Sequence, residues 1–347
     1  GTPTLTLSNG ATASYTSGTG SAALIFTYTV EEGHANSQDL SVTGYSGTIK
    51  DVNGNTADAI GDGDLGAVII DGNSPAFSSV TATGSIYKVG DYVDITVTWG
   101  DAVIVAGTPT LTLSNNASAA YTGGTGSATL VFRYTVAEGH QDSSDLSVTG
   151  YSGTIQDAAG NTAAAVSPVR SLGTVVVDGN SPAFQSVSAA DGTYKVGDQI
   201  PITVTWGEAV VVVGTPTLTL SNNASAAYSS GSGSASLVFT YTVVEGHQNS
   251  SNLSITGYTG IIKDSTAGNT AAQAVDDLGS VIIDANSPAF QSVTATDATY
   301  KVGDDVDITA TWNDAVFVTG TPTLALSNNA TASYTSGSGS AALVFTY

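Results

Sequence analysis

The sequence repeats itself with a period close to 106 residues. The motif Gly-Thr-Pro-Thr-Leu begins at Gly1, Gly107, Gly214 and Gly320, and residues 107–121 recur without change at 214–228. Solenoid and propeller units repeat every 20–50 residues, whereas a small compact domain has about 100 residues. The repeat therefore predicts a tandem array in which each period is one domain.

Each period has the pattern of an all-β domain. Residues 93–99 have the sequence Val-Asp-Ile-Thr-Val-Thr-Trp, and this alternation of apolar and polar residues is typical of half-buried antiparallel strands. It predicts that Trp99 and Trp206 are buried and that Asp94 is exposed. Pairs such as Asn9-Gly10 and Gly90-Asp91 indicate turns between the strands. About seven short strands per period predict an Ig-like antiparallel β-sandwich without the Ig disulfide, since the chain has no Cys.

We expect the strands of one domain to follow a definite order. The first runs over 77–82 and the second over 93–99, with Gly100 and Asp101 in the loop after it. The last runs over 174–177 and leads into a connector.

The phase of the repeat predicts the domain boundaries. The connector Asp-Gly-Asn-Ser-Pro-Ala-Phe starts at Asp71 and Asp178, and returns at Asp284 as Asp-Ala-Asn-Ser-Pro-Ala-Phe. Residues 71–177 and 178–283 should be complete domains. Residues 1–70 should be the C-terminal part of a repeat and 284–347 the N-terminal part, as expected of a piece of a longer array.

The charge balance excludes several classes of protein. The chain has 7 Lys+Arg against 29 Asp+Glu, which gives a formal charge of −22. Binding to nucleic acid or to an anionic membrane surface depends on cations, so we expect neither. We find no apolar run long enough to span a membrane and no signal-peptide pattern. The absence of Cys removes thiol catalysis and Cys-type zinc sites.

Acidic and amide residues gather at the predicted domain junctions. Folding the strands in the expected order brings the connector, the loop after the second strand and the last loop to one end of a domain. The preceding domain adds an acidic loop there. The first junction has Glu31, Glu32, Asp39, Asp71, Asn73, Asp101, Asp157 and Asn161. The second has Glu138, Asp145, Asp178, Asn180, Glu208, Asp264 and Asn269, and the third has Glu245, Asp284, Asn286 and Asp314.

Carboxylates that converge repel one another unless a cation lies among them. Calcium takes six to eight oxygen ligands, Asn and backbone carbonyls included, in a flexible geometry. The junctions are therefore candidate calcium sites. A plain structural interpretation stands beside this one, because Asp-x-x-Gly-Asn is also an ordinary turn sequence.

The repeat resembles a known family of domains. The motifs that carry the resemblance include Tyr-Lys-Val-Gly-Asp, Gly-Thr-Pro-Thr-Leu-Thr-Leu-Ser-Asn and Asn-Ser-Pro-Ala-Phe. They resemble the tandem Ig-like extender repeats of giant bacterial surface adhesins and cell-surface motility proteins. The resemblance implies an extracellular spacer that often binds calcium between domains. This chain departs from the family at His34, His140 and His247, where an acidic residue is common, which weakens one possible ligand per junction.

Other residues favour structural roles. The histidines are spaced one per repeat, so we expect exposed loop residues rather than a zinc site. Asn116, Asn223 and Asn329 lie in Asn-Ala-Ser/Thr sequons on predicted turns and could carry glycans in a host that attaches them. We find no arrangement typical of a catalytic triad, a carboxylate pair or a phosphate loop, and we expect no enzyme activity.

Three functions are compatible with these patterns. The first is a non-enzymatic spacer, such as an adhesin stalk, whose partners are neighbouring repeats and whose junctions are stiffened by calcium. The second is a subunit of a self-assembling extracellular filament or surface layer, in which copies associate through unpaired strands. The third, a glycan-binding module, has little support because no exposed aromatic cluster is predicted.

Overall fold

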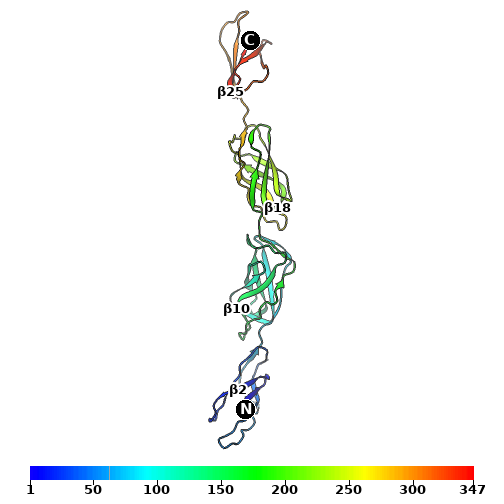
Figure 1. Cartoon of the computed structure of the whole chain (residues 1–347), viewed down its shortest axis with the longest axis vertical. Helices are drawn as coiled ribbons and strands as arrows, with labels where there is room; N and C mark the ends of the chain where they lie inside the picture. The colour runs from blue at the N-terminus through cyan, green and yellow to red at the C-terminus, as the bar shows by residue number, and fades with distance from the viewer. Residues whose placement is uncertain (62) are drawn as a thin grey trace. The chain divides into compact units, whose positions relative to one another are not determined.

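The computed structural model of this chain describes residues 1–61 and 63–347, and every regular element among them is a β-strand. The structure divides into two compact units, residues 1–181 with 264–269 and residues 182–263 with 270–347. The strands β2, β10, β18 and β25, labelled in Figure 1, belong to four different sheets. No helix able to cross a membrane occurs in the described part of the chain.

In the first unit, residues 1–72 form a five-stranded antiparallel sheet and a separate antiparallel pair. The sheet has the order β3-β2-β1-β5-β6, and the pair is β4 with β7. These strands are β1 (Thr4–Leu7), β2 (Thr12–Ser17), β3 (Ile25–Thr27), β4 (His34–Ser37), β5 (Ser41–Ser46), β6 (Gly63–Asp64) and β7 (Ile70–Gly72).

The next strands of this unit form a larger sheet of order β11-β12-β10-β13-β14, with β8 also paired to β10. A separate parallel pair consists of β9 and β15. The strands are β8 (Phe77–Ala82), β9 (Ser85–Lys88), β10 (Tyr92–Leu113), β11 (Ser118–Gly123), β12 (Ser127–Thr135), β13 (Ser147–Gln156), β14 (Arg170–Ser171) and β15 (Val175–Asp178).

The second unit contains a sheet of the same order, β19-β20-β18-β21-β22 with β16 on β18, and the parallel pair β17 and β23. A five-stranded sheet of order β24-β25-β28-β27-β26 follows. Its strands are β16 (Phe184–Ser188), β17 (Gly192–Lys195), β18 (Gln199–Leu220), β19 (Ser225–Ser230), β20 (Ser234–Thr242), β21 (Ser254–Asp264), β22 (Asp276–Asp277), β23 (Val281–Asp284), β24 (Phe290–Ala295), β25 (Asp307–Val316), β26 (Thr323–Ala325), β27 (Thr331–Ser336) and β28 (Ser340–Thr346).

The long strand β10 belongs to two ladders. Its first half pairs with β8 and β12, and its second half pairs with β13 and β11. The register shifts between Thr98 and Val103, where the strand changes partner. The predicted loop at Gly100 and Asp101 is therefore wrong, because the strand continues through these residues. This arrangement is consistent with the β-sandwich class.

Alternation along β10 places its apolar residues inside. Val93, Ile95, Val97 and Trp99 are buried, whereas Asp94 is exposed and pairs with Arg133 at 2.7 Å. The Trp99 indole N–H donates to the carbonyl of Ala164 at 3.2 Å, so the ring is buried with its polar atom satisfied. The burial predicted for Trp99 and Trp206 and the exposure predicted for Asp94 are confirmed.

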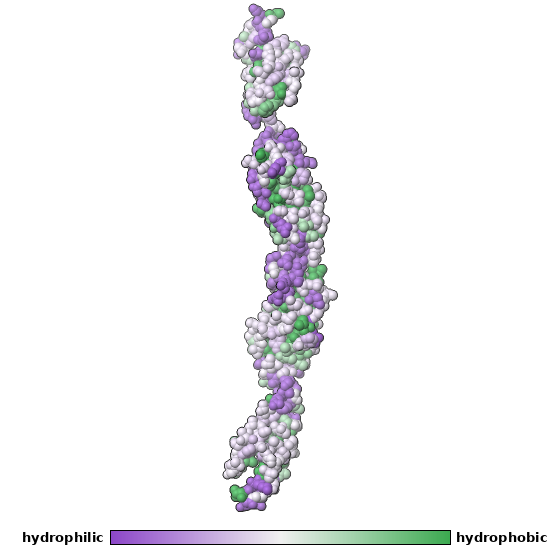
Figure 2. All heavy atoms as spheres, viewed as in Figure 1, coloured by the Kyte–Doolittle hydropathy of each residue, from purple (hydrophilic) through white to green (hydrophobic). Residues whose placement is uncertain are grey.

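Buried apolar side chains form four clusters, two large and two small. The large ones contain 20 residues between Val93 and Val177 and 22 residues between Ile200 and Ala285. The small ones contain five residues each, between Leu7 and Ile70 and between Ile308 and Phe345. On the visible face, apolar residues occur only in small scattered groups (Figure 2). Most of the apolar packing therefore lies within residues 93–285.

Candidate functional site

The first connector is held by Glu32. Its carboxylate accepts hydrogen bonds from the backbone N–H of Ser74 at 3.1 Å and from the Ser74 hydroxyl at 2.6 Å. These hydrogen bonds lower the pKa of Glu32 below its ordinary value, because they favour the ionised carboxylate. Glu32, which precedes β4, thus restrains the connector at Ser74.

Asn161 also holds this connector, and Asp157 holds Asn161 in place. One oxygen of Asp157 accepts the backbone N–H groups of Ala159, Gly160 and Asn161, and the other accepts the Asn161 amide at 2.9 Å. Burial raises the pKa of Asp157, but these four N–H donors outweigh it and hold the pKa below its ordinary value. The Asn161 amide also donates to the carbonyl of Asp71 at 3.1 Å.

The first junction also contains a hollow rich in oxygen atoms. Its lining residues are Asn36, Asp71, Asn73, Asp101, Ala102, Asp157 and Ala158. Asp101 is exposed, and no hydrogen bond or ion pair to it is found within the described residues. Three carboxylates from the connector, from β10 and from the turn after β13 therefore border one space.

The second connector is held in the same manner. Glu138 accepts from the Ser181 N–H at 2.9 Å and from its hydroxyl at 2.7 Å. Asn269 is buried, and its amide donates to the carbonyls of Asp178 and Asn180 at 3.1 and 3.2 Å. The Asn269 side-chain oxygen accepts from the Val89 N–H at 2.8 Å.

Asp178 and Asp264 are both buried at this connector. Asp264 accepts backbone N–H groups from Thr266, Ala267, Gly268 and Asn269, so its carboxylate closes a tight turn. The pKa of Asp178 is raised by burial and by the negative charges of Asp264 and Asp142.

Asp142 is a junction residue that sequence reasoning missed. It accepts the Gly179 N–H and the Asn180 amide, each at 2.9 Å. Asn36 and Asn249 make the equivalent bonds to Gly72 and Asn73 and to Ala285 and Asn286. The sequence signal for this residue is that each repeat has a short polar side chain at the same position. It is hard to recognise because the side chain is charged in Asp142 and neutral in Asn36 and Asn249.

The third connector repeats part of this pattern. Glu245 accepts from the N–H and hydroxyl of Ser287 at 3.0 and 2.6 Å, and these bonds lower the pKa of Glu245. Asp284 accepts from the Asn249 amide at 3.3 Å and the Asn286 N–H at 3.5 Å. Asp314 is exposed and accepts from Ala315 N–H, while Glu208 is half-buried on β18.

The donor set at the first hollow suits calcium, because it consists of carboxylate and amide oxygens. In the described part of the chain, however, no three Asp, Glu or His side chains are close enough to hold an ion between them. The oxygens of Asp157 and Asp264 already accept N–H groups, as the plain turn interpretation requires. Calcium at the junctions stays a prediction.

Other sequence-predicted groups have structural surroundings. The three histidines are half-buried rather than exposed. In each case the ring nitrogen Nδ1 bonds to a Tyr hydroxyl and accepts a backbone N–H, as His140 does with Tyr134 at 2.9 Å and Ala137 at 3.1 Å. Asn116, Asn223 and Asn329 adopt positive φ, which Asn tolerates at turns. Asp145 accepts from the Ser171 hydroxyl at 2.6 Å.

No family model matches this chain, and no curated protein matches it.

Proposed function

We propose that this chain is a non-enzymatic structural spacer, such as the stalk of an adhesin. In this proposal it is a tandem array of Ig-like domains with a period near 106 residues, part of a long extracellular surface protein with calcium at its junctions. The observation that carries the proposal is the way in which the connectors are held.

The first two connectors receive the same contacts from both flanking segments. A Glu that precedes the connector accepts two hydrogen bonds from its Ser, as Glu32 does with Ser74. An Asn that follows the connector donates to its backbone carbonyls, as Asn161 does with Asp71. Such contacts restrict the connector, and a restricted connector is what a spacer needs to keep its ends apart.

The polar groups of the connectors bind other groups of the same protein. Carboxylates that close turns and hold connectors favour a structural joint over an enzyme site, since catalytic carboxylates must face a substrate. The extracellular location is supported by the resemblance to bacterial surface repeats.

Deletion of one predicted domain tests the proposal. Removing residues 178–283 joins Val177 to Asp284 and restores a Val-Asp connector. We expect the shortened chain to keep its strand-rich far-UV spectrum and its main melting transition. Its maximum dimension in small-angle scattering should fall by about the length of one domain.

The control removes half as much of the chain. Deletion of residues 178–230 cuts through one predicted domain and should unfold the segment that follows. If the two deletions damage folding equally, the array is not built from independent domains and the spacer proposal fails.

A further inference from the structure

The dipeptide Asn-Gly occurs at Asn9 and at Asn53. Glycine has no Cβ, so its backbone nitrogen is open to the side-chain amide of the Asn before it. Such a pair can lose ammonia without an enzyme, which turns the Asn into an acidic residue, and Asn is for this reason a thermolabile residue. The two pairs differ in how the fold holds the Asn side chain.

Asn53 lies in a turn that is closed by Asp51. One oxygen of the Asp51 carboxylate accepts the backbone N–H groups of Asn53 and Asn55 at 2.9 and 2.8 Å. The Asn53 side chain is exposed, and no hydrogen bond to it is found among residues 1–61 and 63–347. The space beside Gly54, where a Cβ would lie, is empty. The turn therefore holds the backbone and leaves the amide of Asn53 free.

Asn9 has a side chain that is held in place. It is half-buried, and its amide donates to the Tyr28 hydroxyl at 3.0 Å and to the Ala35 carbonyl at 3.4 Å. In the next repeat, Asn115 is buried and makes the equivalent bond to the Tyr134 hydroxyl at 3.0 Å. The fold therefore restrains the amide at this position in both copies.

The two glycine nitrogens are hydrogen-bonded alike. The Gly10 N–H donates to the carbonyl of Leu7 at 3.0 Å, and the Gly54 N–H donates to the carbonyl of Asp51 at 3.1 Å. Both bonds have to open before the nitrogen can react. The side-chain amide of the Asn, rather than the glycine, is therefore what distinguishes the two pairs.

The exposure at position 53 is also seen in residues 71–177. The corresponding residue there is Ala159, whose N–H donates to the Asp157 carboxylate at 2.9 Å. Ala159 is exposed even though Asn161 of the same turn contacts the first connector. Accessibility at this place is therefore a property of the turn itself.

We propose that Asn53 is a site of spontaneous deamidation and that the fold protects Asn9 from the same reaction. The Gly54 nitrogen attacks the side-chain carbonyl carbon of Asn53 and forms a new C–N bond. The bond from this carbon to Nδ2 breaks, and ammonia leaves with the proton from the Gly54 N–H. Water then opens the resulting succinimide ring at either carbonyl, which leaves aspartate or isoaspartate at position 53.

The reaction is confined to one copy of this turn. Ala159 and Ala267 precede the glycine in the other two copies, and Ala has no side-chain amide. Isoaspartate lengthens the backbone after position 53, so it would displace the Asn55 N–H from the Asp51 carboxylate. The proposal does not depend on calcium or on the spacer role.

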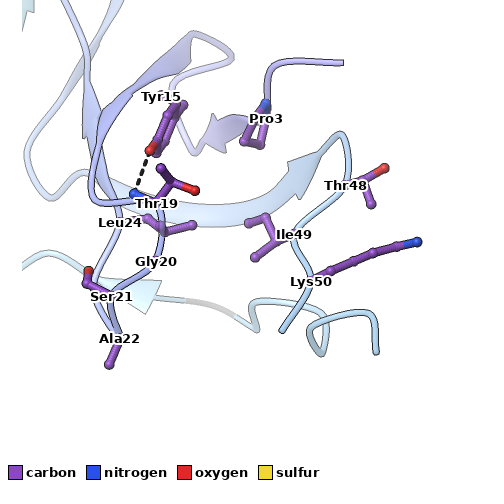
Figure 3. Close-up of a pocket in the computed structure, with 10 residues that line it drawn as sticks. All are labelled: Pro3, Tyr15, Thr19, Gly20, Ser21, Ala22, Leu24, Thr48, Ile49 and Lys50. Carbon is purple, nitrogen blue, oxygen red and sulfur yellow. Dashed lines mark hydrogen bonds between the residues drawn. The ribbon is translucent and has the colours of Figure 1, made fainter. Parts of the chain in front are cut away.

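Tryptic digestion separates the two pairs. Lys50 lies between them in the sequence, and Figure 3 shows its side chain extended away from the residues drawn around it. Cleavage after Lys50 and Lys88 leaves Asn9 in the first peptide and Asn53 in the second. Deamidation raises the mass of a peptide by the difference between a hydroxyl and an amino group, and fragment masses locate the change.

The experiment follows the folded full chain over time at mildly alkaline pH. We expect Asn53 to react about tenfold faster than Asn9, because the Asn9 amide must first lose its hydrogen bonds. In the chain unfolded with guanidinium, the two pairs should react at similar rates, since the dipeptide is the same.

Two variants separate the site from its protection. Asn53→Ala copies the residue found at Ala159 and should abolish the fast reaction without changing the rate at Asn9. Tyr28→Phe removes the hydroxyl that holds the Asn9 amide and should bring the rate at Asn9 closer to that at Asn53. Equal rates at Asn9 and Asn53 in the folded wild type overturn the proposal. So does an Asn53 that stays intact in the folded chain, or a product with aspartate but no isoaspartate.

Discussion

Asp178 carries a carboxyl group that the fold makes harder to ionise. Burial and the neighbouring charges of Asp264 and Asp142 raise its pKa above the ordinary value of 3.8. The folded state therefore holds this proton at a pH where the unfolded chain has lost it. Stability from this group falls as pH rises from 3.8 through the folded pKa, and the loss is complete above it.

Asp178→Asn should therefore stabilise the protein at neutral pH in the presence of a chelator. The amide keeps an oxygen for the Asn269 and Asn180 donors but carries no charge. The gain over wild type should shrink as pH falls through the folded pKa and vanish well below 3.8, where the carboxyl is protonated in both states. Urea unfolding at several pH values measures this. A destabilised variant, or a difference that is constant with pH, would contradict the argument.

Residue-level prediction from the sequence worked where alternation decides the outcome. Trp99 and Asp94 lie on opposite faces because they are an odd number of residues apart in one strand. Asp142 was missed because the charge at its position differs between repeats, with Asn36 and Asn249 at the equivalent places.

Each connector is an element held mainly by a few polar side chains, and Asn269 is buried and donates to two connector carbonyls. Asn269→Ala would leave the carbonyls of Asp178 and Asn180 and the Val89 N–H without this partner. Unpaired buried groups cost about 1–3 kcal/mol, so we expect a loss of at least that size in unfolding free energy. Asn161→Ala is the matched variant at the first connector and should cost less, because Asn161 is only half-buried. Equal losses would contradict this order.

Elements with clear end signals were predicted well. The strand expected over 77–82 has those bounds in the structure. The bounds of β10 were not predicted, because a strand can continue through Gly100 and Asp101 by shifting its register and changing partner. The parallel pairing of β9 with β15 was also missed, since alternation within one strand does not show the direction of its neighbour.

At the scale of the whole molecule, calcium binding at the junctions is the prediction that goes furthest beyond what the sequence itself shows. The hollow is lined by Asp71, Asp101 and Asp157, and a cation bound there would be attracted by their carboxylates. An ion that binds only the folded state raises stability by about 2.7 kcal/mol when its concentration is a hundredfold above Kd. Chelator should therefore lower the melting temperature of the full chain and shorten its mean end-to-end distance in small-angle scattering. Magnesium should restore little, because it requires a tighter octahedral shell.

The variant Asp101→Asn separates a specific site from general screening of negative charge. Asp101 borders the hollow and makes no hydrogen bond or ion pair within the described residues, so removing its charge should leave the fold intact but weaken calcium binding. Asp305→Asn removes the same charge at an exposed position outside this hollow and should leave the calcium response unchanged. Calorimetric titration of calcium into the wild type, Asp101→Asn and Asp305→Asn measures these differences in binding. If calcium has no effect on melting or scattering of the wild type, the junction carboxylates act only through the N–H groups they accept, and the hydrogen-bonded connectors alone limit bending.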